Sequence, residues 1–308
     1  MDGSVATIGF FDGVHCGHQF VIGFLVDEAR QRGLQSVVVT FDEHPRKVIA
    51  PPRPSPIERE QYLLTPRNEV RMLILEAGAD RCEVIHFDKE MAQLSAHDFM
   101  SKILKERLNV KVLLMGYDNR FGHRTPQSQE GFNDYVRYGQ ELGIEVKALP
   151  AWGKGPQLSS SAVRHALRDG DVALAAQLLG RHYSITGRVV HGYEEGHRLG
   201  FPTANIDPAS VETMIPASGV YAVAVSSSPT LERRMGMMNI GTRPTYGSHD
   251  LSLEVHLLDF DGDLYGSQLV VTFLQRIRAE RTFSSPDELK QQLETDRKAV
   301  EELIKNNI

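Results

Sequence analysis

The sequence contains very little cysteine. Only Cys16 and Cys82 occur in 308 residues, too few for a disulfide framework in a chain of this length. No group of cysteines and histidines has the spacing of a structural zinc site either. This composition indicates a protein that works in the reducing environment of the cytoplasm.

Positive charge and long apolar runs are also lacking. The formal net charge is −6 at pH 7, which argues against nucleic-acid binding through a basic surface. No apolar run approaches the roughly 20 residues that a membrane-spanning helix needs. The first residues lack the basic and apolar regions of a secretory signal peptide. We therefore expect neither a nucleic-acid partner nor a membrane segment.

The chain has neither a Walker lysine motif nor a G-x-G-x-x-G fingerprint. Residues 5–11 instead predict a buried strand, followed by a glycine-containing turn and a helix over residues 18–32. The start of a helix offers unpaired N–H groups and the positive end of its dipole to an anion. His15 and His18 add donors at this point. The turn predicts a triphosphate site, whereas its ordinary alternative is polar surface.

Strand and helix patterns alternate through the first half of the chain. Predicted strands follow at residues 35–41, 81–87, 111–115 and 145–149, with helices at 65–77, 95–108 and 130–142. Such alternation is typical of an open parallel sheet with helices on both faces. In such sheets, ligands bind where the strands end at their carboxyl sides.

Two further segments of this half carry polar groups. Residues 116–124 form a basic loop between glycines, with Asp118 and Arg120 inside it; a ligand loop and a solvated turn explain it equally well. A serine run then leads into a predicted helix, where hydroxyls and a guanidinium form a second anion clamp or simply a capped helix with a surface arginine. Its members are Ser159, Ser160 and Arg164.

The periodicity changes in the second half. After a helix at residues 169–179 and a linker at 180–182, short strand patterns are separated by turn residues, and one helix from about residue 285 to 305 closes the chain. The strand patterns cover residues 183–190, 220–226, 235–240, 251–258 and 269–277. This pattern predicts a small antiparallel barrel or sandwich. We expect domains at residues 1–182 and 183–308.

Two features of the second half have both an ordinary and a functional interpretation. The glycine-rich residues 187–205 are a plain hairpin turn or a loop over phosphates, with Arg198 among the glycines. On the strand at residues 251–257, Ser252, Glu254 and His256 share the polar face. By pattern alone that face is simply solvated.

Four spaced motifs make the first half resemble the adenylyltransferase half of the bacterial bifunctional riboflavin kinase/FMN adenylyltransferase (FAD synthetase) family. They are Gly9-x-Phe11-Asp12-Gly-x-His15-x-Gly17-His18, Phe41-Asp42-x-His-Pro45, Gly116-x-Asp118-x-Arg120-Phe-Gly122 and Ser159-Ser160-x-x-Val-Arg164. Phe10, Asn119 and Val70 depart from the usual family residues.

The resemblance implies roles for these motif residues. His15 and His18 would stabilise charge around the ATP α-phosphate, and Ser159, Ser160 and Arg164 would bind the phosphates that leave as pyrophosphate. The remaining ATP-binding and flavin-binding positions implied by the motifs are Gly9, Phe11, Asp12, Gly17, Asp118 and Arg120.

The sequence G-x-x-x-G-x-x-L-G-F-P-T-A-N at residues 192–205 resembles the riboflavin kinase signature of the same family. The resemblance implies that Thr203 and Asn205 hold Mg²⁺ and nucleotide phosphate, and that Glu254 is the catalytic base. Gly196 and Arg198 would contact the nucleotide, although His197 replaces the usual arginine.

The family resemblance implies a Rossmann-like nucleotidyltransferase domain followed by a six-stranded antiparallel barrel with a C-terminal helix. It also implies two reactions with MgATP: riboflavin to FMN and ADP, then FMN to FAD and pyrophosphate. The FMN phosphate is already an anionic nucleophile, whereas the riboflavin hydroxyl must lose a proton. The alternatives are a protein with only the kinase half active, and a flavin-binding or nucleotide-binding regulator without turnover.

Overall fold

The computed structural model describes residues 3–43, 48, 63–116, 121–122, 130–150, 158–192, 196, 199–227, 231–245 and 248–306. The chain forms two compact units, residues 1–55 with 65–158 and residues 56–64 with 159–308. Across the described ranges, we find no helix that combines the length and apolar character needed to cross a membrane.

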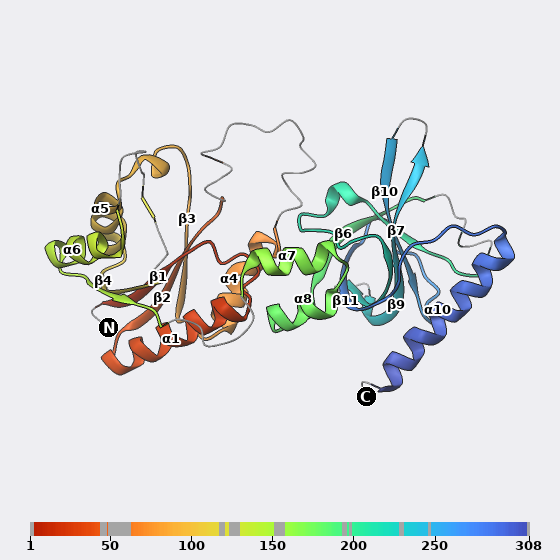
Figure 1. The fold of residues 1–308 in the computed structure, drawn as a ribbon, viewed down its shortest axis with the longest axis horizontal. Helices are drawn as coiled ribbons and strands as arrows, with labels where there is room; N and C mark the ends of the chain where they lie inside the picture. Colours follow the sequence, from red (N-terminus) through yellow and green to blue (C-terminus); the bar gives the residue numbers. More distant parts are fainter. Residues whose placement is uncertain are drawn as a thin grey trace. The chain divides into compact units, whose positions relative to one another are not determined.

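A five-stranded parallel sheet organises the first unit (Figure 1). Its strands lie in the order β3-β2-β1-β4-β5, so the strand before the histidine turn is central. The strands are β1 (Ser4–Ile8), β2 (Gln35–Phe41), β3 (Arg81–Ile85), β4 (Val110–Met115) and β5 (Glu145–Ala148). This arrangement confirms the predicted parallel sheet.

Helices cover both faces of this sheet. Alternate strand residues point to opposite faces; Val5 and Val38 pack with Ile22 of the first helix, on one face. Ile8, on the other face, packs with Phe99. The helical segments are α1 (Cys16–Arg32), α4 (Arg67–Glu76), η1 (Met91–Gln93), α5 (Ala96–Phe99), its π-helical continuation η2 (Met100–Arg107) and α6 (Phe132–Leu142). Burial on both faces explains the continuous apolar runs of the strands.

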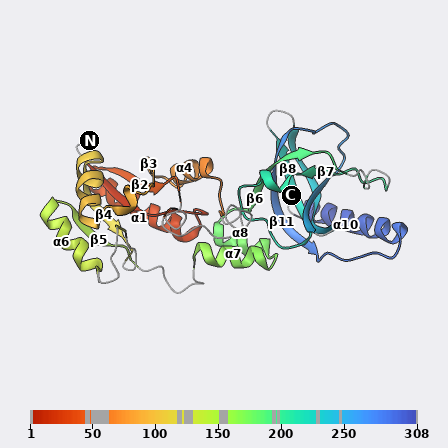
Figure 2. The same ribbon diagram turned by 90° about the horizontal axis from the view of Figure 1, so that it is seen from above.

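A closed antiparallel barrel organises the second unit, with the strand order β10-β7-β6-β11-β8-β9. The strands are β6 (Ser184–Val190), β7 (Ala204–Ile206), β8 (Gly219–Ser227), β9 (Leu231–Thr245), β10 (Ser248–Leu257) and β11 (Gln268–Arg278). The C-terminal helix α10 (Pro286–Asn306) lies along the outside of the barrel (Figures 1 and 2). These features confirm the predicted barrel and helix.

The barrel wall has an apolar inner face and a mixed outer face. Leu253 and Val255 of β10 are buried beside Ile206 and Ile240 of the neighbouring strands. Glu254 alternates with them and therefore faces outward. Helix α10 covers part of the outer wall in an apolar cluster that includes Phe201, Met237 and Val300.

Two helices before the barrel, α7 (Ser160–Arg168) and α8 (Val172–Leu179), belong to the second unit. The Ala217 N–H donates to the Leu167 carbonyl at 2.9 Å, and a short 3₁₀ helix, η3 (Pro208–Ser210), follows β7. The compact units therefore divide the chain earlier than residue 182. The assignment of one activity to residues 1–182 and the other to 183–308 remains a prediction.

Candidate active sites

The turn after β1 has an unusual backbone. Phe11 and Val14 have φ values of 42° and 38°, and Gly13 between them has a φ of 87°. A β-branched residue rarely adopts a positive φ, and strained residues of this kind cluster at functional sites. Asp12 is buried in the same turn. The Gly9 N–H donates to the Val39 carbonyl at 3.0 Å, so the end of β1 is fixed where the turn begins.

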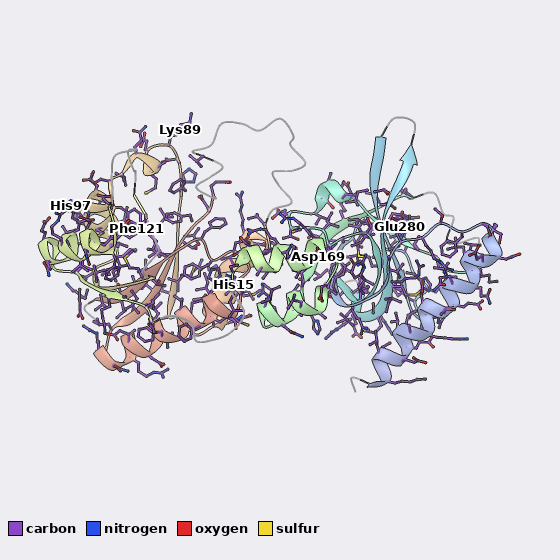
Figure 3. All side chains as sticks on the ribbon, viewed as in Figure 1. His15, Lys89, His97, Phe121, Asp169 and Glu280 are labelled. Carbon is purple, nitrogen blue, oxygen red and sulfur yellow. The ribbon has the colours of Figure 1, made fainter. Side chains whose placement is uncertain are left out.

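His15, labelled in Figure 3, directly precedes helix α1 and caps it with its own ring. The backbone N–H of His18 donates to Nδ1 of His15 at 3.3 Å, so in the neutral ring the proton lies on Nε2. The two imidazoles stack with centroids 3.7 Å apart. A Cβ at Gly17 would lie 3.1 Å from the His15 ring and 3.3 Å from Leu158. Glycine therefore allows the stacked pair to pack closely.

His18 is a partly exposed, neutral imidazole whose Nδ1 atom is buried. Burial, and to a lesser extent the neighbouring His15, holds the pKa of His18 well below its usual value. Its Nδ1 is buried and has no hydrogen-bond partner within the described residues. Buried polar atoms usually have a hydrogen-bond partner, which can be a protein group, a water or a ligand. At neutral pH the His18 ring is therefore uncharged.

The predicted serine-capped helix is present as α7. Ser159 is its N-cap, and its Oγ accepts a hydrogen bond from the Ala162 N–H at 3.2 Å. Ser160 is the first helical residue, and Arg164 follows one turn later. These residues lie in the second unit, whereas His15 and His18 lie in the first. Six residues named in the sequence analysis fall outside the described ranges: Pro45, Asp118, Asn119, Arg120, His197 and Arg198.

In the barrel, strand pairing brings Glu254 between two asparagines. Glu254 on β10 is directly opposite Asn205 of β7 and Asn239 of β9. Side chains at directly opposite positions have Cβ atoms roughly 5 Å apart. The Ser252 hydroxyl donates to Glu254 Oε1 at 2.8 Å. The outer wall therefore presents a carboxylate oriented by a hydroxyl and flanked by two amides.

Two glycines, Gly192 and Gly196, lie very close to the residues at and just before β7. A Cβ at Gly192 would overlap the Asn205 side chain, and a Cβ at Gly196 would overlap the Phe201 carbonyl and lie 3.4 Å from Thr203 Oγ1. The Thr203 hydroxyl and the Asn205 amide each carry an oxygen that can act as a metal ligand. Mg²⁺ prefers oxygen ligands and is usually bound together with phosphate oxygens. The described residues contain no group of three or more His, Cys, Asp or Glu side chains arranged to hold a metal. Thr203 and Asn205 could supply two of the oxygen ligands of a Mg²⁺ ion, and ATP phosphate oxygens are suited to supply others.

A cavity of about 380 Å³ lies beside Thr203 at the barrel wall. Val189, Val255 and Leu257 give it an apolar lining, and Tyr265 forms part of its wall. The Tyr265 ring stacks on the His191 ring with centroids 3.9 Å apart. Asp261 and Asp263 also line the cavity, so its lining is mixed. Cavities that combine apolar walls with a few polar groups are typical of small-molecule sites.

The environment of His256 differs from the sequence prediction. It was expected on a polar face with Ser252, yet it is only 8% exposed. Its Nδ1 lies 2.8 Å from the Pro202 carbonyl oxygen, and burial lowers its pKa. Alternation along one strand cannot reveal this contact, because the partner comes from a distant segment.

The C-terminal arginines of the barrel are bound within the unit. Arg276 donates to the carbonyls of Asp169 and Ser218, at 3.1 and 2.6 Å. Arg278 donates to the buried Asp296 carboxylate of α10 at 2.8 Å. These contacts connect β11 to α7–α8 and to α10.

Comparison with known proteins gives matches to both halves. The FAD synthetase family model matches residues 1–162, and the riboflavin kinase family model matches residues 179–304. The bifunctional riboflavin kinase/FMN adenylyltransferase of Escherichia coli K12 is 40% identical over 306 residues, covering 98% of this chain and 93% of that protein. The protein of the same name from Bacillus subtilis 168 is 35% identical over 297 residues, covering 96% and 90%.

A solved structure is also similar over nearly the whole chain. A crystal structure described as a macrolide-efflux protein from Streptococcus pneumoniae has a TM-score of 0.84 and 30% identity, and the match covers 97% of this chain and 94% of that one. The similarity therefore includes the fold of both units as well as the sequence.

Proposed function

Because this chain belongs to the bifunctional riboflavin kinase/FMN adenylyltransferase family, we propose that it makes FAD from riboflavin in two ATP-dependent steps. The kinase step, assigned to residues 183–308, transfers the γ-phosphoryl group of ATP to riboflavin and gives FMN and ADP. The adenylyltransferase step, assigned to residues 1–182, gives FAD and pyrophosphate. We place both steps in the cytoplasm.

The observation that carries the kinase assignment is the pairing of Glu254 with Asn205 across β10 and β7. Glu254 accepts the proton of the riboflavin 5′-hydroxyl as its oxygen attacks the γ-phosphorus, and the ADP oxygen leaves. Ser252 holds the carboxylate in place through its hydroxyl. Thr203 and Asn205 would hold Mg²⁺, which would neutralise charge on the ATP phosphates when bound.

The cavity beside Thr203 supports a place for the rest of the nucleotide. Its apolar lining residues, such as Val255 and Leu257, suit the flat face of an adenine, while Thr203 suits the phosphates. The glycine contacts at Gly192 and Gly196 keep the phosphate-binding segment close to Asn205 and Thr203. In this arrangement the adenine would occupy the cavity, and the Glu254 carboxylate lies outside the cavity lining.

The adenylyltransferase step needs charge stabilisation and no general base. The FMN phosphate oxygen attacks the α-phosphorus of ATP, and pyrophosphate leaves. His15 and His18, with the N–H groups at the start of α1, donate to the charge that develops there. Ser159, Ser160 and Arg164 bind the departing phosphates. Gly9, Phe11, Asp12 and Gly17 shape the turn, and Asp118 and Arg120 complete the ATP and flavin contacts.

Product analysis tests the proposal. The purified protein is incubated with MgATP and either riboflavin or FMN, and flavins, ADP and pyrophosphate are quantified. We expect FMN and ADP first, then FAD and pyrophosphate. FMN without FAD would leave only the kinase half active. Flavin retained without release of ADP or pyrophosphate would contradict both activities.

A further inference from the structure

We infer that His256 is a positioning residue of the kinase site, which sets the place of Thr203 by holding the carbonyl of Pro202. The inference rests on the proposed kinase function. The Nδ1 atom of His256 lies 2.8 Å from the Pro202 oxygen, and Pro202 directly precedes Thr203.

Strand register explains why a side chain holds this carbonyl. β7 and β10 pair from Leu253 opposite Ile206 to Val255 opposite Ala204. One step further, the same register places His256 opposite Thr203. The ladder cannot continue with Pro202 as a donor, because proline has no backbone N–H. The Pro202 carbonyl oxygen can still accept a hydrogen bond, and the imidazole of His256 is the donor that it contacts.

The direction of this hydrogen bond is fixed by its chemistry. A carbonyl oxygen only accepts, so Nδ1 of His256 carries the proton and donates. The amide nitrogen of an asparagine side chain can occupy nearly the same place as Nδ1. A glutamine amide extends further, toward the place of Nε2. Asparagine and glutamine therefore form a matched pair, because they carry the same amide at two different distances from the backbone.

The His256 ring is itself held rigidly. It is 8% exposed, and it packs edge-on against Phe201 with centroids 5.1 Å apart. Phe201 packs in the apolar cluster with Met237 and Val300, and its N–H donates to the Gly196 carbonyl at 2.9 Å. The segment that ends at Thr203 is therefore anchored on both sides, by the cluster under α10 and by the hydrogen bond from β10.

This arrangement gives one strand two tasks in the kinase step. Glu254 and His256 are two residues apart on β10 and share its outer face. Glu254 acts on the riboflavin hydroxyl, and His256 fixes the segment that binds the ATP phosphates. Strand β10 thereby fixes the distance between the riboflavin hydroxyl, which accepts the phosphoryl group, and ATP, which donates it. Loss of the His256 hydrogen bond should affect the use of MgATP more than the binding of riboflavin.

The test uses the full-length protein with His256→Phe, His256→Asn and His256→Gln. Phenylalanine keeps the ring that packs against Phe201 but cannot donate. His97→Phe is the matched control, because His97 also packs edge-on against an aromatic ring, Tyr138, at 5.4 Å and lies outside both proposed sites. FMN formation is measured against MgATP and against riboflavin. FAD formation from supplied FMN is measured on the same samples.

For His256→Phe we expect kcat/KM for MgATP in FMN formation to fall about 10- to 100-fold. KM for riboflavin and FAD formation from FMN should stay at the wild-type values. His256→Asn should recover most of the loss, His256→Gln should not, and His97→Phe should match the wild type.

Wild-type kinetics in His256→Phe would overturn the inference, as would equal losses in the Asn and Gln variants. Thermal melts are recorded for every variant. If His256→Phe loses the barrel transition, the Asn and Gln pair decides the question, because the two side chains have the same polarity. A wild-type protein that forms no FMN at all would instead contradict the proposed function.

Discussion

The turn with His15 and His18 in the first unit and the outer face of β10 with Glu254 in the barrel are both proposed to act on phosphates, but with different chemical groups. The turn offers N–H donors: a helix start, a ring that caps it, and a neutral imidazole. The barrel offers a carboxylate, held by Ser252 and paired with Asn205. The difference follows the acceptor in each proposed reaction. A phosphate is already ionised, whereas an alcohol has to lose its proton.

The largest effect is expected from Glu254→Gln. The amide keeps the size of the side chain but cannot accept the proton, so FMN formation should fall about 10²- to 10⁴-fold. FAD formation from supplied FMN should be unchanged, because no base is needed there. Rates of both half-reactions on one protein preparation measure this. Loss of both activities from a folded variant would show that the two sites are not independent.

The converse effect is expected from His18→Ala. Removing one preorganised donor from a developing charge should slow FAD formation about 10²- to 10³-fold, while FMN formation should continue at the wild-type rate. The assay follows FAD from supplied FMN and FMN from riboflavin. An unchanged rate of FAD formation would remove His18 from the proposed site.

A smaller effect is expected from Ser252→Ala. The lost hydrogen bond to Glu254 contributes on the order of 1 kcal/mol, so kcat for FMN formation should fall about 5-fold with KM for riboflavin unchanged. Ser101→Ala is the control, since Ser101 donates to the Glu106 carboxylate at 3.3 Å on an exposed helix. Equal effects of the two substitutions would argue against a special role of Ser252.

The histidine turn should also make the first unit less stable in acid. The pKa of His18 is lowered by burial, so below pH about 6.5 the unfolded chain takes up a proton that the folded chain does not. The free energy of unfolding should therefore fall as the pH drops through this range. Thermal melts at pH 7.5 and 5.5 should show a larger decrease for the wild type than for His18→Ala. The same decrease in both would contradict this account.

The sequence predicted the parts of the molecule that depend on local pattern. The parallel sheet, the serine-capped helix α7 and the outward face of Glu254 follow from periodicity and turn residues. For the second unit, periodicity left a barrel or a sandwich open, and the family resemblance implied the barrel. Strand β7 was not predicted, because an alternating pattern cannot be recognised in only three residues. The π-helical turn η2 was predicted as ordinary α-helix, since both repeats bury similar positions.

The contacts that organise the candidate sites depend on distant residues. Asn239 lies beside Glu254 only because of the register of β9 and β10. His256 is buried because Phe201 and the Pro202 carbonyl come to it from another segment. His15 was predicted as a donor at a helix start, but its function as the cap appears only in the folded backbone. The sequence pattern indicates which residue types are candidates for a site, whereas the atoms that come into contact depend on the folded structure.

The most direct measurement of the central contrast is the solvent isotope effect on each chemical step. Single-turnover FMN formation and FAD formation are followed by rapid quench in H₂O and in D₂O, at matched pL near 8. FMN formation should be slower in D₂O, because Glu254 removes a proton from the hydroxyl in that step. FAD formation should proceed at nearly the same rate in both solvents. Equal isotope effects on the two steps would contradict the account.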